Sequence, residues 1–134
     1  MQICKSAGVN DRVVGLDGCA EPGVDADRVA AARERLFDDD RLLGIAEVFR
    51  LLGDPGRVRI LYALLDAGEV CVCDLSATVG ATESNVSQAL RLLRTAGVVK
   101  HRRDGRKVYY RLADAHVRLL LDLSAEHAAH SGTD

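Results

Sequence analysis

The residues best suited to chemistry lie near the C-terminal end of the chain. Three of the four histidines stand at positions 116, 127 and 130, and Asp114 precedes the first of them by two residues. Imidazole nitrogens together with a carboxylate oxygen suit a tetrahedral zinc ion, and also cobalt or nickel. The pattern Asp114-x-His116 with His127-x-x-His130 therefore predicts a site for a divalent metal ion, with zinc as the first choice.

A single copy of this segment cannot complete such a site. We expect a helix from about 114 to 130, on which His127 and His130 share a face, while Asp114 and His116 converge only if Asp114 is the N-cap. At 1.5 Å of rise per residue the two pairs stand about 20 Å apart. Two antiparallel copies across a twofold axis would bring the pairs together and form two symmetric sites. The alternative is a set of surface histidines on an amphipathic helix.

The four cysteines form a second candidate site, for a softer metal. We expect Cys71 and Cys73 to lie at the start of a helix, where the helix dipole lowers the pKa of a thiol. Two thiolates are too few to enclose an ion, and Cys4 and Cys19 from the N-terminal arm could complete a four-sulfur set. Such a set favours cadmium, lead or zinc. The alternatives are structural or incidental cysteines, and a two-thiol redox switch at Cys71 and Cys73.

A second group of polar side chains lies on an amphipathic segment from Glu83 to Arg94, with Thr82 as its expected N-cap. Apolar residues recur along one side of this segment at the spacing of a helix, namely Val86, Leu90 and Leu93. The opposite side carries groups that can bind base edges and phosphates, namely Ser84, Asn85, Ser87, Gln88, Arg91 and Arg94. This polar side predicts a DNA recognition helix.

The flanking elements support this prediction. A shorter amphipathic segment, 73–79, precedes the helix across the break at Gly80-Ala81, and two such helices across a turn form a helix-turn-helix. β-forming residues then flank a basic stretch at 101–107, where Asp104-Gly105 favours a two-residue hairpin turn. A basic hairpin in this place is the wing of a winged helix, and four of its side chains should lie near the DNA backbone or minor groove: Arg102, Arg103, Arg106 and Lys107. A solvated charged hairpin is the alternative.

The distribution of charge also favours a nucleic-acid partner. The whole chain carries a net charge of −2, which by itself argues against one. Residues 91–111, however, hold eight basic and one acidic side chain, a net charge of +7. One basic block in an acidic protein predicts a localised phosphate-binding surface.

Size and composition limit the fold. The 134 residues suffice for one domain, and 48% hydrophobic but only 4% aromatic residues give a Leu, Val and Ala core that favours helices. We expect residues 1–23, with four glycines, to form a flexible arm, and residues 24–134 to form the DNA-binding and dimerisation domain. The predicted fold is mainly α with a small β-hairpin, and further helices are expected at about 25–37, 40–52 and 55–66. A homodimer is expected because the C-terminal helix is unusually apolar.

The chain shows no feature of a membrane protein or of an enzyme. It has no apolar run near 18 residues and its start lacks the apolar core of a signal peptide, so we expect a cytoplasmic protein with reduced cysteines. Four protein ligands would leave a zinc ion no open position for a reacting water. Beside a DNA-binding function, a metal buffer protein is an alternative of another class.

On these motifs the chain resembles the ArsR/SmtB family of bacterial metal-sensing repressors, over about Leu42 to His130. The shared motifs are Glu69-Val-Cys-Val-Cys-Asp-Leu75, Glu83-Ser-x-Val-Ser-x-x-Leu-Arg-x-Leu-Arg94, Gly105-Arg-x-Val-Tyr-Tyr110 and the Asp and His pattern described above. The resemblance implies a winged-helix homodimer that binds palindromic operator DNA when metal-free and leaves it when a metal ion binds. A repressor that senses thiol oxidation through Cys71 and Cys73 is the nearest rival.

The resemblance also implies roles for the ligand residues. Asp114, His116, His127 and His130 correspond to a site on the C-terminal helix, and His130 is similar to the last ligand of nickel and cobalt sensors. Cys71 and Cys73 correspond to the thiolate site of cadmium and lead sensors, although Cys19 does not fall at the expected place. Ser76 stands where arsenite sensors carry a third cysteine. We expect the C-terminal-helix site to be the main regulatory one.

Overall fold

The computed structural model of the protein describes residues 18–131, which belong to two compact units, 1–42 and 43–134. In the first unit, α2 (Ala26–Arg35) begins where the Asp25 carboxylate accepts a hydrogen bond from the backbone N–H of Arg28 at 3.1 Å. α3 (Asp39–Leu52) begins in the same way after Asp38 and runs on into the second unit. Both helices agree with the predicted ranges to within two residues, because acidic N-caps are strong local signals.

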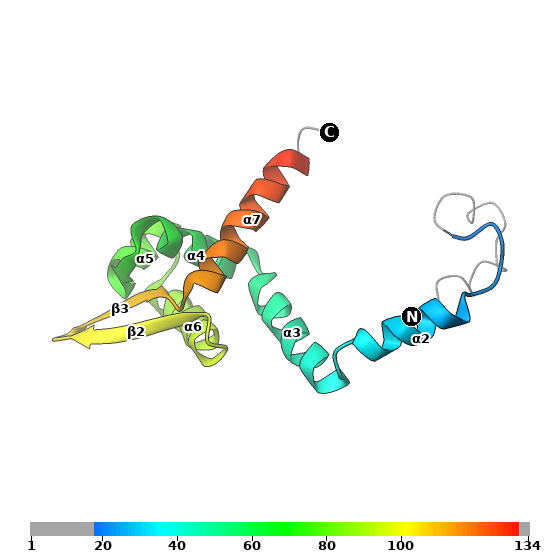
Figure 1. Cartoon of the computed structure of the whole chain (residues 1–134). Coiled ribbons are helices and arrows are strands. Elements are labelled where there is room, and N and C mark those ends of the chain that lie inside the picture. The colour runs from blue at the N-terminus through cyan, green and yellow to red at the C-terminus, as the bar shows by residue number, and fades with distance from the viewer. Residues whose placement is uncertain (1–17, 132–134) are drawn as a thin grey trace. The chain divides into compact units, whose positions relative to one another are not determined.

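The second unit has the element order of a winged helix (Figure 1). In chain order its elements are α4 (Pro55–Ala67), β1 (Glu69–Cys71), α5 (Val72–Val79), α6 (Glu83–Thr95), β2 (Val99–Asp104), β3 (Lys107–Leu112) and α7 (Ala115–Ser131). The predicted helix-turn-helix is α5 with α6, and the predicted wing is β2 with β3. The fold class is therefore confirmed.

The sheet contains one strand that the sequence did not predict. β1 pairs antiparallel with β3, which places Cys71 opposite Tyr109, and the strand order is β1-β3-β2. Three residues are too few to show a strand period, and the partner of β1 lies about forty residues away in the chain. The pairing therefore had no local sequence signal.

Two turns set the direction of the recognition helix and of the wing. Gly80 ends α5 in the left-handed conformation, with φ of 71°, and the Thr82 hydroxyl then accepts a hydrogen bond from the N–H of Asn85 at 3.1 Å. The break at Gly80 and the Thr82 N-cap were predicted. In the wing, Asp104 pairs with Lys107, so the two-residue loop is Gly105-Arg106, one residue later than predicted. Gly105 occupies the position with positive φ, 64°, which a residue without Cβ adopts most easily.

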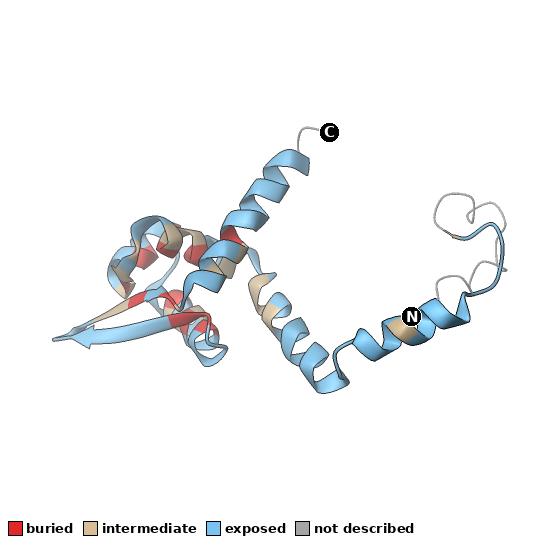
Figure 2. Cartoon of the chain, in the orientation of Figure 1, coloured by how far each residue is buried: buried red, intermediate tan, exposed pale blue. Residues whose placement is uncertain are grey.

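The core of the second unit is formed by residues of α4, α5, α6, the sheet and α7 (Figure 2). Its most deeply buried side chains are Leu61 and Leu64 of α4, Leu75 of α5, Val86, Leu90 and Leu93 of α6, and Val99 of β2. The predicted apolar side of the recognition helix is therefore confirmed. α7 contributes one buried residue, Leu121, and its backbone carbonyl accepts a hydrogen bond from the Tyr62 hydroxyl at 2.7 Å.

Two helices of a single chain leave apolar side chains in water. Leu43 and Phe49 of α3 are 67% and 60% exposed, and Leu119 and Leu123 of α7 are 56% and 54% exposed. Exposed apolar side chains that gather on one face are typical of surfaces that contact another molecule. Within residues 18–131, no helix is both long and apolar enough to cross a bilayer.

The burial pattern of α6 makes a direct prediction about stability. Leu90→Ala, at a position with 0% exposure, should lower the free energy of unfolding by about 2–5 kcal/mol because it opens a cavity in the core. Leu92→Ala, on the same helix at 48% exposure, should change it by about 0.5 kcal/mol or less. Urea denaturation at one fixed protein concentration would measure both. Equal losses in the two variants would contradict the packing described here.

Candidate nucleic-acid interface and metal centres

The polar side of α6 faces away from the core. Because Val86, Leu90 and Leu93 are fully buried, the helix cannot rotate about its axis, and the opposite side is presented to solvent. The residues predicted to contact DNA on this helix are Ser84, Asn85, Gln88, Arg91 and Arg94, which are exposed, and Ser87, which is half-buried. All six are therefore at least partly accessible to solvent.

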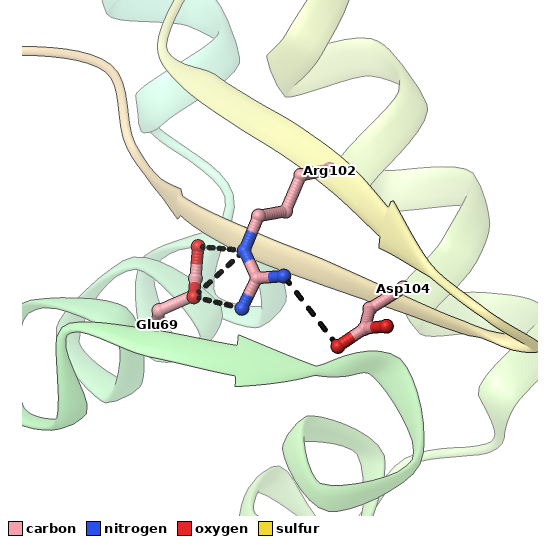
Figure 3. Close-up of polar contacts among 3 residues, drawn as sticks. All are labelled: Glu69, Arg102 and Asp104. Carbon is pink, nitrogen blue, oxygen red and sulfur yellow. Dashed lines mark hydrogen bonds and ion pairs between the residues drawn. The ribbon is translucent and has the colours of Figure 1, made fainter.

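Arg102 of the wing forms an ion pair with Glu69 of β1, the strand that the sequence did not predict. Arg102 of β2 donates from Nη2 to Glu69 Oε1 at 2.7 Å and from Nε to both carboxylate oxygens at 3.0 Å (Figure 3). Its guanidinium also lies 3.9 Å from Asp104 Oδ2 and 4.6 Å from the centre of the Tyr109 ring. In the free protein this arginine is therefore already neutralised, unlike the other cations predicted to contact DNA.

The ion pair shifts the titration of both partners. The hydrogen bonds from Arg102 lower the pKa of Glu69 despite partial desolvation, and the positive charges of Arg102 and Arg111 lower it further. In turn, Glu69 raises the pKa of Arg102. Sequence reasoning did not single out Glu69, because only the β1–β3 pairing places it where the Arg102 side chain of β2 can reach it across β3.

The other face of the hairpin meets the recognition helix. Arg94 of α6 donates from Nη1 to the Tyr110 hydroxyl at 3.3 Å, and the same nitrogen lies 3.5 Å from His101 Nε2. The His101 and Tyr110 rings are stacked with centroids 5.6 Å apart. Arg94 therefore joins α6 to both strands of the wing. The sequence offered no signal for this contact, because the predicted turn at Asp104-Gly105 would place position 101 opposite position 108, and only the observed register places it opposite Tyr110.

The first metal-ligand pair comes together at the start of α7. Asp114 is the N-cap, and its Oδ1 accepts a hydrogen bond from the N–H of Val117 at 3.1 Å. His116 Nδ1 lies 3.8 Å from the same oxygen, and the His116 side chain is 94% exposed. This is the non-helical N-cap that the sequence required for Asp114 and His116 to converge. The cap hydrogen bond engages Oδ1, and each carboxylate oxygen keeps a lone pair that could bind a metal ion.

The second pair lies near the far end of the same helix. His127 and His130 are exposed, and His130 Nε2 is 4.0 Å from Glu126 Oε1. α7 is continuous from Ala115 to Ser131, so the two pairs stay about 20 Å apart along its axis. Among the described residues of one chain, no three His, Cys, Asp or Glu side chains are grouped to hold a metal ion. One chain therefore holds the predicted ligands as two separate pairs.

The thiol pair differs from expectation. Cys71 is the buried N-cap of α5, and exposed Cys73 donates a hydrogen bond from Sγ to Glu83 Oε1 at 3.7 Å. The negative charge of Glu83 raises the pKa of Cys73, so the prediction of a lowered pKa at the helix start is wrong for this thiol. Glu83 begins α6, and only the α5–α6 packing places it there. Cys19 is exposed in the first unit, and Cys4 lies outside the described residues.

Comparison with known proteins adds to this geometry. Residues 54–101 match the family model described as bacterial regulatory protein, arsR family. The transcriptional repressor SmtB homolog of Synechocystis sp. is 42% identical over 84% of this chain and 85% of its own length. The cadmium resistance transcriptional regulatory protein CadC homolog of Staphylococcus aureus is 36% identical over 83% and 91%.

A solved structure shares the fold. The homodimeric winged helix-turn-helix DNA-binding domain of a possible ArsR-family transcriptional regulator from Mycobacterium bovis, solved in solution, superimposes with a TM-score of 0.65. The identity is 28%, over 72% of this chain and 92% of that one. These relatives are transcriptional regulators and not enzymes.

The Glu69–Arg102 pair predicts a pH dependence. Because the pKa of Glu69 is lowered in the folded protein, its contribution to stability is present above the unfolded carboxyl pKa and is lost as the pH falls through the folded pKa. Arg102→Gln should therefore lower the Tm at pH 7, and the difference from wild type should shrink toward pH 3. Arg106→Gln, at the exposed hairpin loop, is the matched control. A difference that is the same at both pH values would contradict the pairing.

The Cys73–Glu83 contact predicts a change in thiol reactivity. In a Cys4→Ser/Cys19→Ser background, Glu83→Gln should speed alkylation of Cys73 by iodoacetamide at pH 7.5, because removing the carboxylate lowers the pKa of the thiol. Buried Cys71 should react slowly in both proteins. Rates can be followed by mass spectrometry of the peptide that carries Cys73. An unchanged or slower rate in Glu83→Gln would show that the carboxylate does not control this thiol.

Proposed function

Because the chain belongs to the bacterial ArsR family of regulatory proteins, we propose that it is a metal-responsive transcriptional repressor. It binds double-stranded operator DNA as a metal-free homodimer in the cytoplasm and is released when a divalent metal ion binds. The observation that supports this most strongly is α7, which carries two pairs of metal ligands at opposite ends of one straight, largely exposed helix. Such an arrangement has an evident use only when a second copy of the helix lies beside the first.

The homodimer accounts for the exposed apolar side chains. Leu43 and Phe49 on α3, with Leu119 and Leu123 on α7, provide the surface that a partner copy would cover. With two α7 helices antiparallel, Asp114 and His116 of one subunit face His127 and His130 of the partner subunit. The solved Mycobacterium bovis relative is itself a homodimer. Two equivalent sites per dimer follow from the twofold axis.

The donor set suits a borderline metal ion. Three imidazole nitrogens and one carboxylate oxygen of Asp114 fit zinc in a tetrahedron, and cobalt or nickel with an expanded coordination shell. The residues present therefore fit the metal that the family implies. When bound, the ion supplies a cross-link between the two α7 helices.

The thiolate site takes the second place in this proposal. Cys71 and Cys73, with Cys4 and Cys19 of the arm, would suit cadmium or lead, and the CadC homolog is named for cadmium resistance. The structure gives two reasons to rank this site lower. Cys71 is buried, and the raised pKa of Cys73 keeps that thiol protonated at neutral pH. A metal would have to displace this proton.

The regulation can be described as a competition between two dimer geometries. Operator binding needs the two α6 helices at the spacing of the half-sites. α7 is attached to the core of the winged helix through buried Leu121 and through the 2.7 Å hydrogen bond from Tyr62 of α4 to the Leu121 carbonyl. A shift of α7 therefore moves α4 and the core that holds α6. Metal and DNA then oppose each other reciprocally, by about 1–3 kcal/mol.

Mixed dimers test the site across the subunits. Asp114→Ala/His116→Ala and His127→Ala/His130→Ala should each abolish cobalt binding at α7 and metal-induced release of a duplex that wild type selects from a random library. A refolded equimolar mixture should regain about a quarter of the wild-type stoichiometry, because half of the dimers are mixed and each mixed dimer has one intact site. Visible absorption of bound cobalt and fluorescence anisotropy of the duplex would measure the two effects.

The controls separate the rival sites. His101→Ala lies outside α7 and should keep full cobalt stoichiometry. Release that persists in both double variants but disappears in Cys71→Ser/Cys73→Ser would assign regulation to the thiols. Release by an oxidant in the presence of a chelator would instead indicate a redox switch.

A further inference from the structure

The surface between α6 and the wing contains a small hollow whose charged lining is entirely cationic. Its volume is about 220 Å³, below the range of pockets that enclose drug-sized molecules. Its polar lining consists of Ser87, Arg91, Arg94, His101, Arg103 and Tyr110. No Asp or Glu contributes to it. A hollow of this size and charge suits a single small anionic group.

The two faces of the wing differ in how their arginines are compensated. Arg102 is held by Glu69 and lies near Asp104, so its charge is already balanced. Arg103, the next residue, points to the opposite face by the alternation of a strand and lines the hollow. The adjacent arginines are therefore a matched pair within one strand. One is neutralised within the protein, and the other has no acidic neighbour in the hollow it lines.

Arg94 is fixed in position before any ligand arrives. Its Nη1 donates to the Tyr110 hydroxyl at 3.3 Å and lies 3.5 Å from His101 Nε2. Tyr110 is only 6% exposed and stacks on His101, so this support is rigid. A guanidinium has five N–H donors, and Nε and Nη2 are left to donate to an anion. Fixing the side chain in advance lowers the entropy that binding must otherwise remove.

We propose that this hollow binds one phosphodiester group of the DNA backbone, with Arg94 as its anchor and Arg91 and Arg103 beside it. Tyr110 and His101 are positioning residues that hold the Arg94 guanidinium. The phosphate joins the recognition helix to the wing and so sets the register of α6 in the major groove. The inference rests on the proposed function only in taking duplex DNA as the source of the phosphate.

Salt dependence of duplex binding gives the first test. With a duplex selected from a random library by wild type, Arg94→Gln should weaken binding about tenfold or more, since a hydrogen bond to a charged group is lost. It should also reduce the slope of log K against log salt by about one unit per subunit. Arg50→Gln, on α3 outside the predicted DNA-binding surface, removes an arginine paired with Glu47 at 2.9 Å and should leave both within about twofold and 0.3 units of wild type.

A scan with neutral phosphates separates positioning from general structural support. Methylphosphonate would replace each backbone phosphate of the duplex in turn. For wild type, methylphosphonate at one position per half-site should weaken binding more than at any other. In Arg94→Gln, the substitution at that position should no longer weaken binding. Tyr110→Phe should lose about three- to tenfold in affinity, with the loss confined to that same phosphate. Tyr109→Phe, on the opposite face of the wing, is the control and should match wild type at every position.

The outcomes are distinguishable. If wild type selects no duplex at all, the proposed function is wrong. If wild type binds but Arg94→Gln keeps the wild-type slope and phosphate profile, the phosphate site is wrong and the function stands. If Tyr110→Phe weakens every position equally, Tyr110 is not a positioning residue. If inorganic phosphate alone shifts the NMR signals of the His101 and Tyr110 rings while the methylphosphonate scan is flat, the assignment to DNA is overturned.

Discussion

The apolar stripe of α6 is buried against α4, α5 and the sheet, and this contact orients every other feature of the reading surface. Val86, Leu90 and Leu93 have no exposed surface, so the helix has one possible rotation about its axis. The polar side then faces outward, and Arg94 falls where the wing begins. A recognition helix held only by its ends would not present its side chains with a defined register.

Electrostatics on the wing follow from which carboxylates the fold brings near. The basic block at 91–111 would suggest an undivided patch of cations. Strand β1 divides this patch, because its Glu69 neutralises Arg102. The arginines that face α6 have no acidic neighbour among the residues that line the hollow. A second carboxylate, Glu83 at the start of α6, raises the pKa of Cys73 and so favours its protonated thiol form. A protein with net negative charge thereby keeps a localised cationic face.

α7 carries both predicted ligand pairs and is packed against the core that supports α6. A straight helix separates Asp114 and His116 from His127 and His130 by more than any one ion can span. The same helix is joined to the core at Leu121, between the two pairs, and receives the Tyr62 hydrogen bond there. In the proposed dimer, a change in the relative position of two α7 helices would therefore be transmitted to α4 and, through close packing, to α6.

The sequence alone determined what depends on local spacing. The buried side of α6, the N-caps Thr82 and Asp114, the basic hairpin and the separation of the ligand pairs all follow from periodicity and from residue types a few positions apart. Tertiary structure decided which side chains meet. The Glu69–Arg102, Arg94–Tyr110 and Cys73–Glu83 contacts join residues 33, 16 and 10 positions apart. Helical or strand periodicity carries no information about such partners, because they are set by strand pairing and helix packing across the fold.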